Sequence, residues 1–197
     1  METCDPALDN RFNTAFGFPA ERIRAKVVDT LSEPIKAFIA ESPFAVMATS
    51  SPDGKCDASP KGGPPGFVQV LDDRHLLVPD IAGNLLFQSY LNMDVNPQVG
   101  LIFFIPGLAE VVRVNGRVQI VDRNEVERYD VDDHLDHPAG RRDLLQGIVV
   151  EVEEAYGHCP RAINYSDLWN PDGIRERVAG GSAAHPLRRQ SATTTQD

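Results

Sequence analysis

Two short segments decide how this sequence is interpreted: SPKGGPPGFV at residues 59–68 and VPDIAGNL at residues 78–85. Each places glycines beside hydrogen-bonding or cationic side chains, just after or just before an apolar strand. Backbone N–H groups can approach a phosphate closely where no Cβ stands in the way. The two segments therefore predict a phosphorylated cofactor that is held on a β-barrel.

Short β-rich runs alternate with turns on both sides of these segments. Strands are predicted at residues 44–49, 56–59, 66–71, 75–79, 99–105, 110–121 and 148–154. Helices are predicted at residues 21–30, 33–40, 85–92, 124–129 and 142–146, the second with Ser32 as its cap and Pro34 in its first turn. About six antiparallel strands with frequent turn signals and few helices predict a mainly β (α+β) fold, a small β-barrel with short flanking helices.

The length of 197 residues and a hydrophobic content of 42% predict one domain with terminal extensions. We place an N-terminal arm at residues 1–20, the barrel domain at 21–178 and a disordered tail at 179–197. The arm carries Phe12, Phe16 and Phe18 among Gly and Pro. It is either a segment that docks on its own or a partner subunit's surface, or a disordered one.

Charge and cysteine content narrow the function class. The net charge of −10, without any Lys/Arg-rich run, disfavours nucleic acid and anionic membrane surfaces as partners. The longest apolar run, residues 99–114, is too short and interrupted for a membrane-spanning helix. Cys4, Cys56 and Cys159 are widely spaced, and the polar N-terminus shows no signal-peptide pattern. We expect a soluble, cytoplasmic protein.

The acidic sequence DVDDHLDH, residues 130–137, is dense in possible metal ligands. Its spacing matches no established ligand set, so a hydrated acidic loop is the better interpretation, and no metal site is predicted.

Four segments resemble the pyridoxamine phosphate oxidase-like family of FMN-binding split barrels, in particular its actinobacterial-type branch. They are ATSSPDGKCDASPKGGPPGFVQVLDDRHLLVPD (48–80), GNLLFQSYLNMDVNPQVGLIFFIPG (83–107), EVVRVNGRVQIV (110–121) and HCPRAINYSDLW (158–169). The resemblance extends over residues 32–171. It implies a six-stranded antiparallel split β-barrel, an obligate homodimer, and two FMN sites at the subunit interface.

The resemblance also implies which residues hold the cofactor. The residues matched to cofactor contacts are Ser59, Pro60, Lys61, Pro79, Asp80, Gly83, Asn84, Arg113 and Asn115. Lys61 and Arg113 are expected to be the main charged contacts of the flavin phosphate. Where the family pattern suggests basic residues, this chain carries Leu86 and Tyr165.

The implied activity is that of an FMN-dependent oxidoreductase acting on a small organic substrate at the dimer interface, with a nicotinamide donor as a candidate reductant. In such enzymes the cofactor performs the redox step, while the protein orients it and shapes the pocket. No obligatory acid or base stands out, and Tyr165 and His158 are the weak catalytic candidates. The alternatives are a deazaflavin-dependent reductase on the same fold, and a non-catalytic or degenerate dimeric module that binds flavin or haem.

Overall fold

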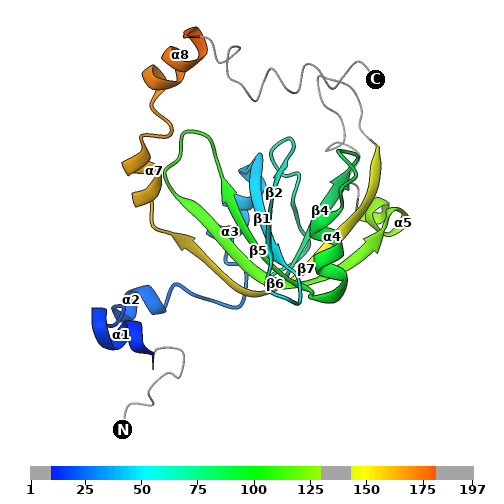
Figure 1. The fold of residues 1–197 in the computed structure, drawn as a ribbon, viewed down its shortest axis with the longest axis horizontal. Helices are drawn as coiled ribbons and strands as arrows, with labels where there is room; N and C mark the ends of the chain where they lie inside the picture. The colour runs from blue at the N-terminus through cyan, green and yellow to red at the C-terminus, as the bar shows by residue number, and fades with distance from the viewer. Residues whose placement is uncertain (1–9, 130–142, 181–197) are drawn as a thin grey trace.

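One sheet of seven antiparallel strands forms the body of the protein in the computed structural model, which describes residues 10–129 and 143–180 (Figure 1). The order across the sheet is β2-β1-β5-β6-β7-β4-β3. The strands are β1 Phe44–Ser50, β2 Cys56–Gly62, β3 Gln69–Val70, β4 His75–Ile81, β5 Gln98–Phe104, β6 Val111–Asp122 and β7 Leu144–His158. The mainly β class is confirmed, with seven strands rather than the six that the resemblance implied; β3 is a two-residue strand that pairs with β4.

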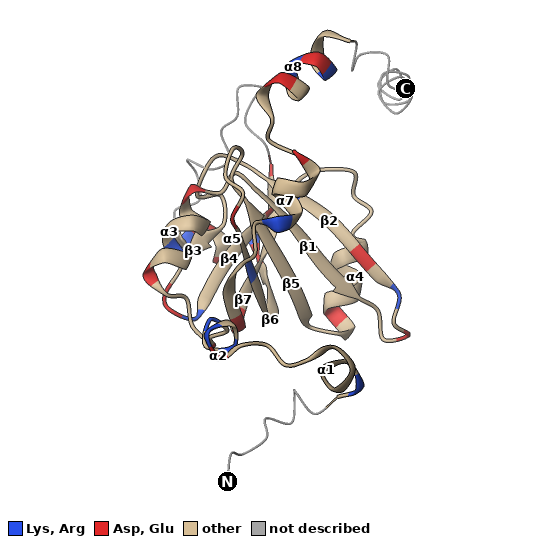
Figure 2. Cartoon of the chain, turned by 90° about the vertical axis from the view of Figure 1, so that its left-hand side faces the viewer, with Lys and Arg blue, Asp and Glu red and all other residues tan. Residues whose placement is uncertain are grey.

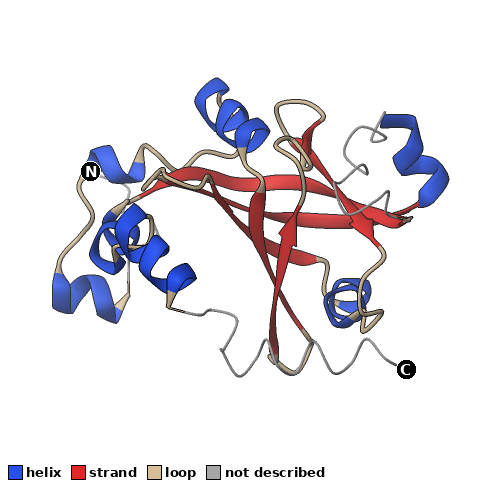
Figure 3. Ribbon diagram, turned by 90° about the horizontal axis from the view of Figure 1, so that it is seen from above, coloured by secondary structure: helices blue, strands red, loops and turns tan. Residues whose placement is uncertain are grey.

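Alternation along the strands decides which side chains enter the core. In β1, Ala45 and Met47 are buried, whereas Phe44, Val46 and Ala48 lie on the other face and remain at least partly exposed. The same alternation buries Leu101 and Phe103 in β5, as the two-residue period of a strand requires. The sheet curls around this core, and Figure 3 shows the helices at its periphery.

The sheet does not close into a complete barrel. Strand β2 pairs with β1 and has no second partner among the described strands, and β3 reaches only Leu76 and Leu77 of β4. Residues 78–81 of β4 therefore pair with β7 alone. The barrel is split between β2 and the end of β4.

The helices are short and flank the sheet. They are α1 Arg11–Phe16, α2 Glu21–Arg24, α3 Glu33–Glu41, α4 Gln88–Val95, α5 Arg123–Val126, the 3₁₀ helix η2 Glu127–Tyr129, α7 Arg161–Ser166 and α8 Pro171–Ala179. Helix α3 buries Ile35 and Ile39 against the core, with Ser32 at its N-cap and Pro34 in its first turn, as predicted. The Ser32 side chain makes no capping hydrogen bond.

Two helix predictions were too long or displaced. The helix predicted at residues 21–30 ends at Arg24, because Val28 instead forms a backbone bridge with Ala155 of β7. The helix predicted at 85–92 begins only at Gln88, since the residues before it have left-handed backbone conformations.

The helix predicted at residues 142–146 is wrong. Residues 144–146 form the first part of β7, where Leu144 pairs with Ile81 and Gln146 with Asp80. Leu144 is buried in a small cluster with Leu77 and Val126. Sheet pairing and burial therefore override the weak local helical pattern.

Helices α1 and α8, the first and last described helices, lie away from the barrel (Figure 1). Helix α1, within the predicted arm, leaves Phe12 and Phe16 exposed. Near α7, the Trp169 indole N–H donates to the Leu108 carbonyl at 2.7 Å, which ties the C-terminal helices to the β5–β6 turn.

Residues 130–137 and 181–197 lie outside the described residues, so the acidic loop and the tail stay predictions. No helix within the described part of the chain has the length and apolar character to cross a membrane.

Gly116 tests the packing of the two long strands, because it lies at the register shift between β6 and β7. A Cβ at this position would lie 2.2 Å from the Glu151 carbonyl oxygen. We expect Gly116→Ala to lower the free energy of unfolding by about 1–3 kcal/mol, measured by urea denaturation. Gly157→Ala on β7 is the matched control, since nothing lies within 4 Å of its added Cβ. Equal losses in the two variants would contradict this prediction.

Candidate functional site

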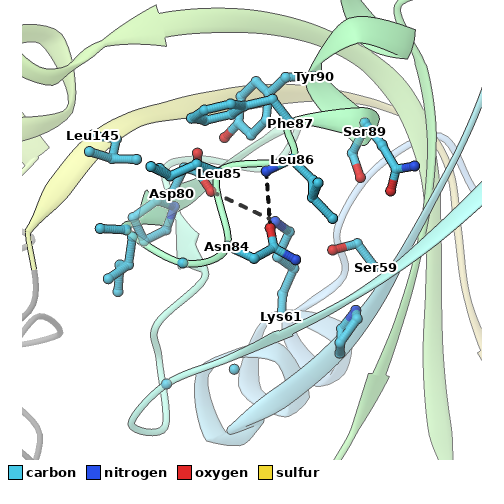
Figure 4. A pocket seen from close by; sticks show the side chains of 18 of the residues that line it. Ser59, Lys61, Asp80, Asn84, Leu85, Leu86, Phe87, Ser89, Tyr90 and Leu145 are labelled. Atoms are coloured by element: carbon cyan, nitrogen blue, oxygen red, sulfur yellow. Dashed lines mark hydrogen bonds and ion pairs between the residues drawn. The ribbon is translucent and has the colours of Figure 1, made fainter. Parts of the chain in front are cut away.

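A groove of about 770 Å³ opens where the barrel is split. Its walls are β2, the end of β4, the loop that follows β4, and the first turn of α4 (Figure 4). On β2, Asp57, Ser59 and Lys61 pair with the inward-facing positions Thr49, Met47 and Ala45 of β1. Their two-residue spacing therefore directs all three side chains to the inner side of the sheet.

Seven of the nine predicted cofactor-binding residues line this groove. They are Ser59, Pro60, Lys61, Pro79, Asp80, Gly83 and Asn84. The two segments that opened the sequence analysis thus meet across the split of the barrel. Whether these residues bind a cofactor stays a prediction.

An ion pair joins the two walls. Lys61 Nζ lies 3.8 Å from Asp80 Oδ1, and the two side chains are only 20% and 12% exposed. Gln146 Nε2 donates to the second oxygen of Asp80 at 3.4 Å. Lys61 is the only cation among the described residues of the groove, which also contains the carboxylates of Asp57 and Asp80.

Helix α4 is held over the groove by polar contacts that the sequence analysis did not identify. The Ser89 hydroxyl, which is buried, donates to Asp57 Oδ2 at 2.5 Å. Asn92 Nδ2 donates to Thr49 Oγ1 at 3.0 Å, and Asn96 Nδ2 to Ser50 at the same distance. These contacts join residues far apart in the chain, so no local pattern could have indicated them.

The loop before α4 has an unusual backbone. Leu85 and Phe87 both have positive φ angles, 56° and 51°, which non-glycine residues rarely adopt. The side-chain amide oxygen of Asn84, Oδ1, accepts a hydrogen bond from the Leu86 backbone N–H at 3.1 Å. The apolar side chains of this loop, with Tyr90, form one wall of the groove (Figure 4).

Gly63 also has a packing role. A Cβ there would lie 2.6 Å from Cβ of Phe67, which is buried in the core and lines the groove. A side chain at residue 63 would therefore displace Phe67.

Arg113 and Asn115 lie elsewhere, on the outward face of β6. Arg113 donates to Tyr156 Oη at 3.2 Å and to Asn115 Oδ1 at 3.3 Å. Asn115 in turn donates to Glu154 Oε1 at 2.8 Å. Within one chain these residues do not line the groove.

The two weak catalytic candidates are also outside the groove. His158 ends β7, with its ring 5.9 Å from that of Tyr156. Tyr165 lies on α7 and is 82% exposed. Within one chain, neither side chain is placed to act on a molecule bound in the groove.

The groove fits the parts of a flavin unequally. Its volume is typical of small-molecule sites, and its apolar wall suits an aromatic ring. At the phosphate end, Lys61 is already paired with a carboxylate, leaving the Ser59 hydroxyl and the Asn84 amide as neutral groups. The residues therefore fit the ring and ribityl chain well and the phosphate less well.

The groove between the two edges of the open barrel has the volume of a small-molecule site. The chain belongs to the pyridoxamine 5'-phosphate oxidase family, whose model matches residues 31–159. No curated protein matches the sequence.

Several solved structures are similar to this chain. An FMN-binding protein from Syntrophomonas wolfei has a TM-score of 0.52 at 8% identity, over 63% of this chain and 83% of that one. HupZ from Group A Streptococcus has a TM-score of 0.49 at 16% identity, over 64% and 92%. An F420 reductase has a TM-score of 0.45 at 19% identity, over 62% and 94%. The first likeness shows a shared fold alone, and the other two support no conclusion.

Tyr90 provides a test of the groove's electrostatics. Burial, and secondarily the neighbouring Asp80 carboxylate, raise the pKa of Tyr90 well above its usual range. Above about pH 10 the Tyr90 hydroxyl loses its proton in the unfolded chain but keeps it in the folded protein, so the free energy of unfolding falls as the pH rises. We expect the unfolding free energy of the wild type to fall more steeply above about pH 10 than that of Tyr90→Phe. Urea denaturation at a series of pH values measures how steeply the unfolding free energy of each protein falls with pH. Equal slopes for the two proteins would contradict the raised pKa of Tyr90.

Proposed function

We propose that this protein is a flavin-dependent oxidoreductase that binds FMN in the groove between β2 and β4. The observation that carries the proposal is that seven residues, predicted from two separate segments, line a single groove of suitable volume. Membership of the pyridoxamine 5'-phosphate oxidase family supports the same assignment. The proposed substrate is a small organic molecule, and a nicotinamide is the proposed donor.

The residues of the groove have distinct proposed roles. A bound flavin supplies the hydride or electron transfer itself. The apolar loop before α4 and Tyr90 shield the ring from water, while Ser59, Lys61 and Asn84 face the ribityl and phosphate end. The titratable side chains Lys61, Asp80 and Asp57 are engaged by one another or by Ser89. We therefore assign the groove residues to binding and orientation only.

We further propose a homodimer, which would bring the remaining predicted residues to the site. The outward face of β1 and β5 carries Phe44, Val46, Ile102 and Phe104, all partly exposed. Neither strand contains a charged residue, as Figure 2 illustrates. Apolar surface of this kind is typical of an interface between proteins.

Arg113 lies beside this face, because Ile102 of β5 pairs with it directly. Two copies packed through the β1–β5 face would present the partner's Arg113 and Asn115 near the edge strand β2. Both residues, which are absent from the groove of their own chain, would then lie beside the groove of the partner. We also propose a cytoplasmic setting, where thiols stay reduced; the described cysteines, Cys56 and Cys159, are unpaired.

The dimer is tested by placing a charge on the proposed interface. We expect the wild type to have twice the chain mass of 21.6 kDa in light scattering after gel filtration. Ile102→Arg buries an unpaired charge at that interface and is expected to shift the protein to the monomer mass. Gln119→Arg, at an exposed position of β6 outside this face, is the control and keeps the dimer mass. A monomeric wild type would rule out the dimer.

The cofactor is tested by the visible spectrum of protein purified without added flavin. We expect the flavin absorbance bands, and FMN in the supernatant after denaturation, identified by mass spectrometry. A haem spectrum, a released deazaflavin, or a colourless protein that leaves the fluorescence of added FMN unchanged would refute the FMN assignment.

The main alternative is a non-catalytic flavin-binding module, which is favoured because Lys61 is already paired with Asp80. Anaerobic addition of NADH or NADPH to the flavin-loaded protein separates the two. Bleaching of the visible flavin band supports the oxidoreductase, and a band that neither donor reduces supports the module.

A further inference from the structure

We infer that Asp80 limits how strongly the groove binds a phosphate group, because it holds Lys61 in an ion pair across the split of the barrel. Flavin recognition then rests on the ring and ribityl chain rather than on the phosphate. This inference rests on the proposed function and adds a specificity-determining residue to it.

The first support is the protected position of the ion pair. Both side chains are largely buried, so water screens their attraction less than it would at the surface. Lys61 Nζ also lies 6.0 Å from the centroid of the Tyr90 ring, which favours the cation in this position. Asp80 is further held by the hydrogen bond from Gln146 on the neighbouring strand β7.

The second support is that another donor of the groove is also engaged. The Ser89 hydroxyl is bonded to Asp57 and is therefore not free for a ligand. Lys61 and Ser89 are thus both engaged by carboxylates of the groove itself. Two carboxylates against one ammonium give the described lining a net negative charge.

A phosphate monoester carries close to two negative charges at neutral pH. To contact Lys61 it must share the ammonium with Asp80 and approach that carboxylate closely, and like charges repel at short range. Backbone N–H groups at the start of α4 remain available to an anion, because no side chain caps this helix. Those donors are the same whichever residue occupies position 80, so a substitution there leaves the backbone contribution unchanged.

Riboflavin is the matched probe, since it has the ring and ribityl chain of FMN and lacks the phosphate. Dissociation constants for both flavins are measured by fluorescence quenching. The protein is used in the oligomeric state in which it is purified, after any bound flavin has been removed. We expect the wild type to bind FMN and riboflavin with affinities within about threefold of each other.

Asp80→Asn keeps the shape of the side chain and removes its charge, so Lys61 becomes free to contact the phosphate. We expect FMN to bind at least about tenfold more tightly to this variant, with the affinity for riboflavin nearly unchanged. Adding Lys61→Gln to Asp80→Asn should abolish the gain. Asp57→Asn removes an equal charge from the groove without touching Lys61, and its gain for FMN should be smaller.

Thermal melting shows whether each variant is folded. The comparison of FMN with riboflavin on the wild type tests the inference even if a variant does not fold. FMN binding at least about tenfold tighter than riboflavin in the wild type, or no gain in Asp80→Asn, would overturn the inference and leave the proposed function intact. If neither flavin binds to the wild type or to any variant, the proposed function fails, and the inference fails with it.

Discussion

The site depends on one constraint, which is that the sheet does not close on itself. The seven-stranded sheet has β2 as one edge, and β3 with the end of β4 as the other, so it leaves backbone and side chains exposed along both edges. Exposed edges are normally protected by charges or by covering elements. Here Lys61 and Asp80 join the two edges, and hydrogen bonds from Ser89 and Asn92 hold α4 against β2 and β1.

The same ion pair has opposing consequences for structure and for binding. A largely buried pair is costly to break, since the remaining charge would lose its partner without regaining water. It therefore favours a well-defined arrangement of the two walls. It also reduces the positive potential that an anionic ligand would meet, so a contact that organises the groove weakens its most obvious phosphate-binding group.

The separation between the groove and the outward face of β6 shows how a second copy could matter. Arg113 and Asn115 form a hydrogen-bonded group with Tyr156 and Glu154 rather than facing the groove. Strand periodicity requires this, because both residues alternate with the buried Val112 and Val114. Their proposed role in cofactor binding therefore depends on an assembly, for which we propose the uncharged β1–β5 face beside them as the contact surface.

The sequence by itself determined the fold class and most strand positions, because strand alternation and glycine turns act over a few residues. Its resemblance to a known family indicated seven of the residues that line the groove. The sequence could not place residues 144–146, whose strand conformation comes from pairing with Asp80 and Ile81, nor the start of α4, which depends on left-handed residues. Only the tertiary structure decided that Lys61 is paired and that Arg113 faces outward. The charges available to a ligand depend on which strand edges meet and how deeply they are buried, and no short segment carries that information.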